Sequence, residues 1–171
     1  MNNRLALRLL PGLLLFTLIA GSVFAQEWKS VDEGEFHLEW MTDGGRLKIV
    51  VSAPTEGWLA VGFDPTNKMK DANIIIGYVE NGRAVVEDHY ANNLFSHRSD
   101  LDFGGSRDVS EVSGRESAGT TELNFTIPLD SGDEYDRPLS VGETYKVILA
   151  YGKRDRISVK HDERESVDIT L

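Results

Sequence analysis

Residues 58–63 read WLAVGF and residues 74–79 read IIIGYV, and these two stretches decide the fold. Both are apolar at consecutive positions, which is typical of short strands that are covered on both faces. Asn81 and Gly82 follow the second stretch and favour the positive φ angles that a type I′ turn requires. We therefore expect residues 83–90 to return as the second strand of a hairpin.

Shorter runs with a period of two surround these stretches, and turn residues separate them. The alternating runs cover residues 36–40, 47–51, 121–127, 145–151, 157–161 and 167–171. No comparable helical period follows the N-terminal segment. The expected fold class is all-β, a single-domain β-sandwich of about ten short strands.

The N-terminal segment has the pattern of a signal peptide. Arg4 and Arg8 form a basic region, an apolar run follows, and small side chains precede a cleavage point after Ala25. We expect residues 1–25 to be removed, which would leave one domain over residues 26–171. The expected location is the periplasm or the outside of the cell, with no membrane insertion of the remaining chain.

Charge and cysteine content exclude several classes of function. Residues 26–171 carry 16 basic side chains (18 − 2) and 28 acidic ones, a net charge of −12. Such a surface repels nucleic acid, so nucleic acid is not an expected partner. The chain has no cysteine, which excludes disulfides, thiolate metal sites and covalent haem attachment through a Cys-x-x-Cys-His motif.

Two residues stand out from the pattern of strands and loops. Met69 lies in a polar loop, and His161 ends the alternating run that places it on the same face as Ile157 and Val159. A methionine and a histidine are a known axial pair for the iron of a b-type haem. Each also has an ordinary explanation, since a methionine can fill a gap in the core and a buried histidine can be hydrogen-bonded.

Other candidate sites have weaker patterns. His89 and His97 could bind a metal, but no third ligand has suitable spacing, and we expect the face that carries His89 to be solvated. Residues 100–111 match part of a calcium-loop pattern, yet a side-chain ligand is missing at the fifth position and Arg107 occupies the usually apolar eighth. We interpret this segment as a polar loop. No nucleophile or phosphate-loop motif is present, so we do not expect an independent enzyme.

Five blocks of sequence resemble one family when they are taken in order. They read GWLAVGFDP (residues 57–65), MKDANIIIGYV (69–79), VEDHYA (86–91), FTIPL (125–129) and VILAYG (147–152). The chain resembles the DOMON domain family, of the haem-binding type, over roughly residues 35–171. The first two blocks are the most specific.

The resemblance implies an immunoglobulin-like β-sandwich that binds haem or a sugar. In haem-binding members the methionine ligand precedes an Ala-x-Ile-x-x-Gly strand, where Met69 stands, and the histidine ligand follows the penultimate core strand, where His161 stands. Some related haem subunits use lysine with methionine, but strand alternation points Lys160 away from the face of Val159. The chain departs from the family pattern in having no disulfide, no flavin domain and Asn73 where many members have aspartate.

These observations predict an exported module for electron transfer that binds haem b non-covalently, with Met69 and His161 as axial ligands of the haem iron. With both axial positions filled, such a centre carries single electrons and offers no open site for other chemistry. A membrane b-type cytochrome or a periplasmic oxidoreductase is the expected redox partner. The alternatives are a haem-free domain that binds a sugar or another small ligand, and an accessory subunit with an empty pocket.

Overall fold

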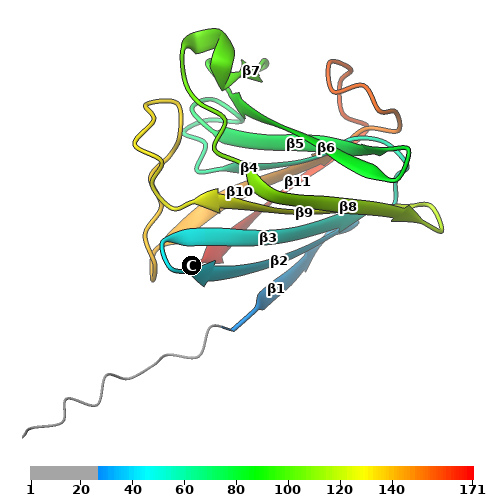
Figure 1. Ribbon diagram of the computed structural model, residues 1–171, viewed down its shortest axis with the longest axis horizontal. Helices are drawn as coiled ribbons and strands as arrows, with labels where there is room; N and C mark the ends of the chain where they lie inside the picture. The colour runs from blue at the N-terminus through cyan, green and yellow to red at the C-terminus, as the bar shows by residue number, and fades with distance from the viewer. Residues whose placement is uncertain (1–26) are drawn as a thin grey trace, which may run out of the picture.

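The first layer of the molecule is an antiparallel sheet of five strands (Figure 1). These strands are β1 (Lys29–Glu33), β2 (Phe36–Asp43), β3 (Arg46–Ala53), β8 (Ser110–Ser117) and β9 (Thr120–Pro128). Their order across the sheet is β1-β2-β3-β9-β8. The structure is a computed structural model that describes residues 27–171, so the expected signal peptide and its cleavage point after Ala25 lie outside the described residues.

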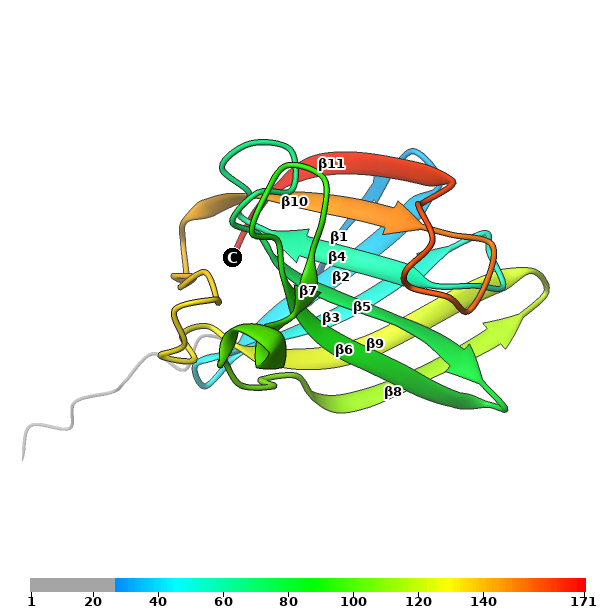
Figure 2. The same cartoon turned by 90° about the horizontal axis from the view of Figure 1, so that it is seen from above.

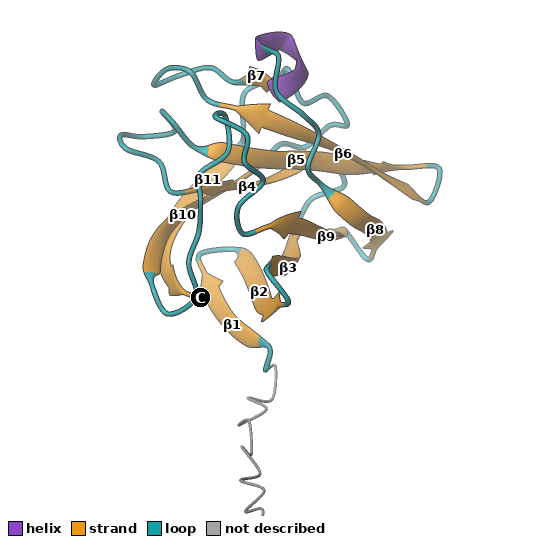
Figure 3. Ribbon diagram, turned by 60° about the vertical axis from the view of Figure 1, so that its left-hand side comes forward, coloured by secondary structure: helices purple, strands orange, loops and turns teal. Residues whose placement is uncertain are grey.

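The second layer is an antiparallel sheet of six strands that packs face to face on the first. These strands are β4 (Leu59–Phe63), β5 (Asn73–Glu80), β6 (Arg83–Tyr90), β7 (Arg98–Ser99), β10 (Thr144–Tyr151) and β11 (Glu163–Thr170). Their order is β11-β10-β4-β5-β6-β7. One turn of 3₁₀ helix, η1 (Asp100–Phe103), follows β7, and the rest of the described chain is strand and loop (Figure 3). Among residues 27–171, no helix is long and apolar enough to cross a membrane.

The predicted all-β sandwich is confirmed. The hairpin of β5 and β6 forms as expected, with Asn81 and Gly82 at φ angles of 51° and 74° between the two strands. A side chain at such an angle is strained unless the residue is glycine or asparagine, so this dipeptide sets the register that pairs Glu80 with Arg83. The alternating runs of β2, β3, β9 and β10 also form strands at the expected places.

Three strands are absent from the prediction, and one predicted strand is wrong. β7 has only two residues, which is too short for any pattern to show. β1 and β8 lie at the edges of the first sheet, where most of their side chains are exposed and no apolar alternation is needed. Residues 157–161 do not pair with another strand and belong to the loop between β10 and β11. The alternation in this loop still matches the pattern of burial. Ile157, Val159 and His161 are half-buried, while Ser158 and Lys160 are exposed.

The main core lies between the two sheets. Its side chains are those that alternate inward from each strand, such as Leu38 and Ile49 in the first sheet and Val61, Ile75 and Leu149 in the second. The exposure of each of these five residues is 1% or less. Burying this much apolar surface is the main favourable term in the stability of the sandwich.

We expect Leu149→Ala to lower the free energy of unfolding by about 2–5 kcal/mol, because it leaves a cavity between β10 and the facing sheet. The matched control is Leu101→Ala, since Leu101 is 61% exposed and its truncation should change the free energy by less than about 0.5 kcal/mol. Urea denaturation at equilibrium measures both. Equal losses in the two variants would contradict this assignment of the core.

Candidate functional site

The outer face of the second sheet carries a second apolar cluster, which we call the outer cluster. It lies on the side of β4, β5 and β10 that faces away from the main core. Its members are Trp58, Ala60, Ala72, Ile74, Ile76 and Ala91, with Met69, Tyr78, Ile148, Ala150 and Ile157 packed against them. This cluster explains why β4 and β5 are apolar at consecutive positions, since both of their faces are buried.

The central strand β4 presents only small residues on this outer face. Ala60 pairs with Ile76 of β5 and Ala150 of β10, and Gly62 occupies the next outward position. A Cβ atom at Gly62 would lie 2.7 Å from Cγ1 of Ile148 and 3.1 Å from Cγ1 of Ile74. The flanking isoleucines therefore approach the backbone of β4 from both sides, and a larger residue at position 62 would push them apart.

Met69 comes from the loop between β4 and β5, which hydrogen bonds hold in a tight conformation. The amide of Thr66 donates to the carbonyl of Lys70 at 2.9 Å, and the amide of Ala72 donates to the carbonyl of Met69 at 3.1 Å. The amide of Asp71 donates to the carbonyl of Ala91 at 2.7 Å, which ties the loop to the end of β6. The side chain of Met69 is half-buried against the outer cluster.

His161 comes from the loop between β10 and β11, and this loop is fixed at its base. The amide of Gly152 donates to the carbonyl of Trp58 at 2.9 Å, and the amide of Asp162 donates to the carbonyl of Tyr151 at 2.8 Å. A Cβ atom at Gly152 would lie 2.3 Å from Nε1 of Trp58, so only glycine permits this packing. The same loop carries Ile157, which packs against the outer cluster.

The two loops begin at opposite ends of the same sheet. β4 and β10 are antiparallel, so the loop that follows β4 and the loop that follows β10 emerge at opposite ends of their shared ladder (Figure 2). Both loops contribute apolar side chains to the outer cluster, Met69 from one and Ile157 from the other. The predicted ligands Met69 and His161 therefore belong to two loops that border one apolar face.

The environment of His161 favours a neutral imidazole. Partial burial lowers its pKa from the usual value, and the positive charges of Arg164 and Lys160 lower it further. Within residues 27–171 the ring makes no hydrogen bond and no ion pair. A neutral nitrogen without a hydrogen-bond partner is the form that can coordinate a metal.

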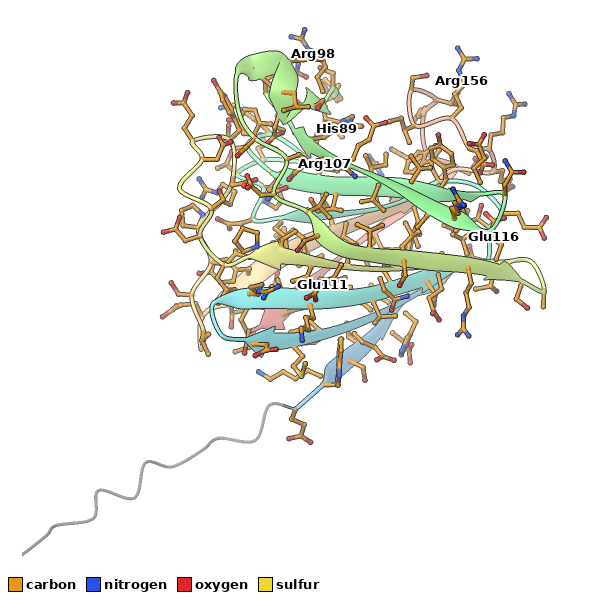
Figure 4. All side chains as sticks on the ribbon, in the orientation of Figure 1. His89, Arg98, Arg107, Glu111, Glu116 and Arg156 are labelled. Atoms are coloured by element: carbon orange, nitrogen blue, oxygen red, sulfur yellow. The ribbon has the colours of Figure 1, made fainter. Side chains whose placement is uncertain are left out.

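The expectation that His89 is solvated is wrong. His89, which is labelled in Figure 4, is 6% exposed. Its Nδ1 lies 2.8 Å from Nδ1 of His97, and its Nε2 lies 3.0 Å from Oε2 of Glu87. Burial lowers the pKa of His97 to about 4, with the neighbouring His89 as the second cause. The two imidazoles satisfy each other, which fits a structural role for this pair.

Sequence reasoning also missed a group of carboxylates at one end of the sandwich. Asp88, Asp108 and Asp136 each offer an oxygen within 4.8 Å of the others. One signal could have revealed Asp88, because alternation along β6 places it on the same inward face as Ala84 and Val86, where a charged side chain is unexpected.

Comparison with known families gives one match over most of the chain. Residues 32–152 match the sequence profile of the DOMON domain. The protein called DBH-like monooxygenase protein 1 is 37% identical over 60 residues in Mus musculus and 33% identical over 88 residues in Homo sapiens. These alignments cover 35% and 50% of this chain but span only 10% and 14% of those relatives.

Two solved structures are similar in fold. The cytochrome domain of cellobiose dehydrogenase from Myriococcum thermophilum has a TM-score of 0.62 at 11% identity, covering 85% of this chain and 82% of that domain. The cytochrome b domain of pyranose dehydrogenase from Coprinopsis cinerea has a TM-score of 0.56 at 10% identity, covering 77% and 75%. At these identities the comparisons show a shared fold.

The buried histidine pair gives a prediction about acid stability. Because the pKa of His97 falls from 6.5 to about 4 on folding, the unfolded chain takes up a proton first as the pH drops through this window, and folding is then disfavoured. Between about pH 7 and pH 5 we expect the native protein to lose roughly 2 kcal/mol more of its free energy of unfolding than His97→Asn does. Urea denaturation at the two pH values measures this, and parallel losses in both proteins would contradict it.

Proposed function

Because the chain belongs to the DOMON domain family, we propose that it is an exported electron-transfer module that holds one non-covalent b-type haem between Met69 and His161. The observation that carries this proposal is the outer cluster. Two loops, one with Met69 and one with His161, border the same apolar face of the second sheet.

The donor set of this face fits haem. Met69 brings a thioether that is already packed on the apolar face, and His161 brings an imidazole that its surroundings keep neutral. Haem is a flat apolar group, and the small outward residues of β4, with isoleucines on either side, provide a surface of the same character. Nε1 of Trp58 is buried without a hydrogen-bond partner and is the one orphaned donor in the outer cluster.

When bound, such a haem would supply reversible one-electron chemistry. The residues of the chain have three tasks in this proposal. Met69 and His161 hold the iron, and the thioether favours its reduced state. The isoleucines of β5 and β10 exclude water from the face. The hydrogen bonds at the base of each loop limit the movement of Met69 and His161.

Basic side chains on the loop of His161 could pair with the haem propionates. Lys153, Arg154, Arg156 and Lys160 are all exposed on this loop, and Arg156 extends away from the sheet in Figure 4. Arginine and lysine form charge-assisted hydrogen bonds with carboxylates of this kind. With only Asp155 and Asp162 as acidic side chains, residues 153–162 have a net positive charge, whereas residues 26–171 as a whole have a net charge of −12.

The proposed role needs a separate redox protein. A six-coordinate haem iron has no free site for a substrate, so the module would exchange electrons with a membrane b-type cytochrome or a periplasmic oxidoreductase and would not act as an enzyme by itself. The N-terminal segment, in which a basic region precedes an apolar run, supports export to the periplasm or the medium.

Substitution of each ligand tests the proposal. We expect the purified protein to bind haem and to show sharp low-spin bands when reduced. Met69→Leu should keep the apolar packing but lose the low-spin bands, and His161→Ala should weaken haem binding by more than about tenfold. Absorbance titration with haem, before and after reduction, measures both effects.

Two control variants use the same residue types elsewhere. Met41→Leu and His37→Ala change residues of β2 in the first sheet and should leave the haem spectrum unchanged. The proposal fails if the native protein stays colourless after haem is added, or if Met69→Leu keeps the native low-spin spectrum. A colourless protein that binds oligosaccharide would instead support the sugar-binding alternative.

A further inference from the structure

The carboxylates at one end of the sandwich come from four separate segments of the chain. Asp88 is near the end of β6, Asp100 opens η1, Asp108 lies just before β8, and Asp136 lies in the loop between β9 and β10. Ligand oxygens of Asp88, Asp108 and Asp136 lie within 4.8 Å of one another. Asp100 belongs to the same group of carboxylates, since the charges of Asp88 and Asp136 affect its pKa more than any other charges do.

Asp88, Asp100 and Asp136 are buried while Asp108 is half-buried, and several of the buried oxygens have no partner. The exposure of Asp100 is 0%, that of Asp88 is 3% and that of Asp136 is 9%. Both carboxylate oxygens of Asp100, Oδ1 of Asp88 and Oδ1 of Asp136 are buried without a hydrogen bond. A buried charged oxygen that lacks a partner is costly and rare in folded proteins, so something must satisfy these four atoms.

No basic side chain neutralises this group. Within residues 27–171, none of the four carboxylates forms a salt bridge. The two nearby arginines are engaged elsewhere, since Nη2 of Arg107 donates to the carbonyl of Val86 at 2.7 Å and Nη2 of Arg137 pairs with Oδ2 of Asp64 at 2.7 Å. Arg107 lies along β6 in Figure 4.

We propose that Asp88, Asp108 and Asp136 bind a hard divalent cation, calcium by preference, and that Asp100 adds a fourth negative charge beside it. Calcium takes oxygen ligands at about 2.3–2.6 Å, so oxygens around one ion are separated by no more than about 5 Å. The 4.8 Å limit on the separation of the three carboxylate oxygens agrees with this geometry. An all-oxygen set of aspartates without histidine or cysteine also favours calcium over zinc.

The carboxylates of the cluster lie close enough to repel one another. Burial, with the charges of the neighbouring carboxylates as a further cause, raises the pKa of Asp88 to about 7, that of Asp100 to about 8 and that of Asp136 to about 6. A divalent cation among them would offset both the repulsion and the cost of burying the charges.

The cation would join segments that are far apart in the sequence. The amide of Asp108 donates to Oδ2 of Asp88 at 2.9 Å, and Oγ of Ser106 donates to Oδ2 of Asp108 at 2.7 Å and to Oδ2 of Asp133 at 3.1 Å. These bonds already hold the loop before β8 against β6 and against the loop between β9 and β10. The ion would fasten the loop between β9 and β10 to the inward face of β6, in a region separate from the outer cluster.

Calcium titration of the full chain tests the proposal. The protein is freed of metal with EDTA, transferred to chelator-free buffer near pH 7.5 and titrated with calcium chloride by calorimetry, with thermal unfolding recorded in parallel. We expect saturable binding of one ion and a rise in Tm of about 5–10 °C at a hundredfold excess over Kd.

Three variants separate binding from a general structural effect. Asp88→Asn and Asp136→Asn should each lose the calcium-dependent rise in Tm, while in EDTA their Tm should equal or exceed that of the native protein, because a buried charge has been removed. Asp102→Asn changes an exposed aspartate of η1 and should keep the full calcium response. Two variants of the cluster are used so that a folding defect in one leaves the other informative.

The result that would overturn the proposal is equally direct. A native protein that shows neither binding heat nor a change in Tm with calcium chloride has no such site. The same holds if Asp88→Asn and Asp136→Asn respond to calcium as fully as Asp102→Asn does. Neither outcome depends on haem, so this test and the haem titration fail independently.

Discussion

The structure depends on the pairing of β4 with both β5 and β10. This ladder gives the second sheet a centre that is apolar on both faces, with Val61 and Leu149 turned to the main core and Ala60 and Ala150 turned to the outer cluster. Without this pairing, the loop of Met69 and the loop of His161 would have no common surface. The amide of Asp64 donates to the carbonyl of Lys146 at one end of the ladder, and the amide of Gly152 donates to the carbonyl of Trp58 at the other, both at 2.9 Å. The sandwich thus places two loops, which the sequence separates by some ninety positions, at opposite ends of one apolar face.

Much of this arrangement could be predicted from the sequence, because the signals are local. Period-two alternation identified most strands, and consecutive apolar residues in β4 and β5 identified a sheet that is buried on both sides. The dipeptide of Asn81 and Gly82 identified a hairpin from backbone sterics alone. Met69 and His161 stood out because each residue type disagreed with its neighbours. Their assignment as haem ligands came from the family resemblance.

The features that escaped prediction are set by neighbours in space. β8 is polar because its side chains are mostly exposed at the edge of a sheet, so it lacks the alternation that reveals a strand. His89 looked solvated from its strand position, yet His97 arrives from a later loop and shields it. The carboxylates of Asp88, Asp108 and Asp136 meet only after three separate segments have folded together, and the sequence pattern around Asp100 pointed to a single continuous loop instead. Long-range assembly of this kind leaves little trace in local sequence.

The outermost strands have a consequence for how the protein behaves among its own copies. An open sheet edge with unpaired amides and carbonyls is a template on which another chain can add a strand. Here β7 has only two residues and β1 only five, while β8 and β11 display mostly exposed, charged or hydroxyl-bearing side chains. Each of the four rims is therefore short or hydrophilic, which disfavours fibril-like stacking.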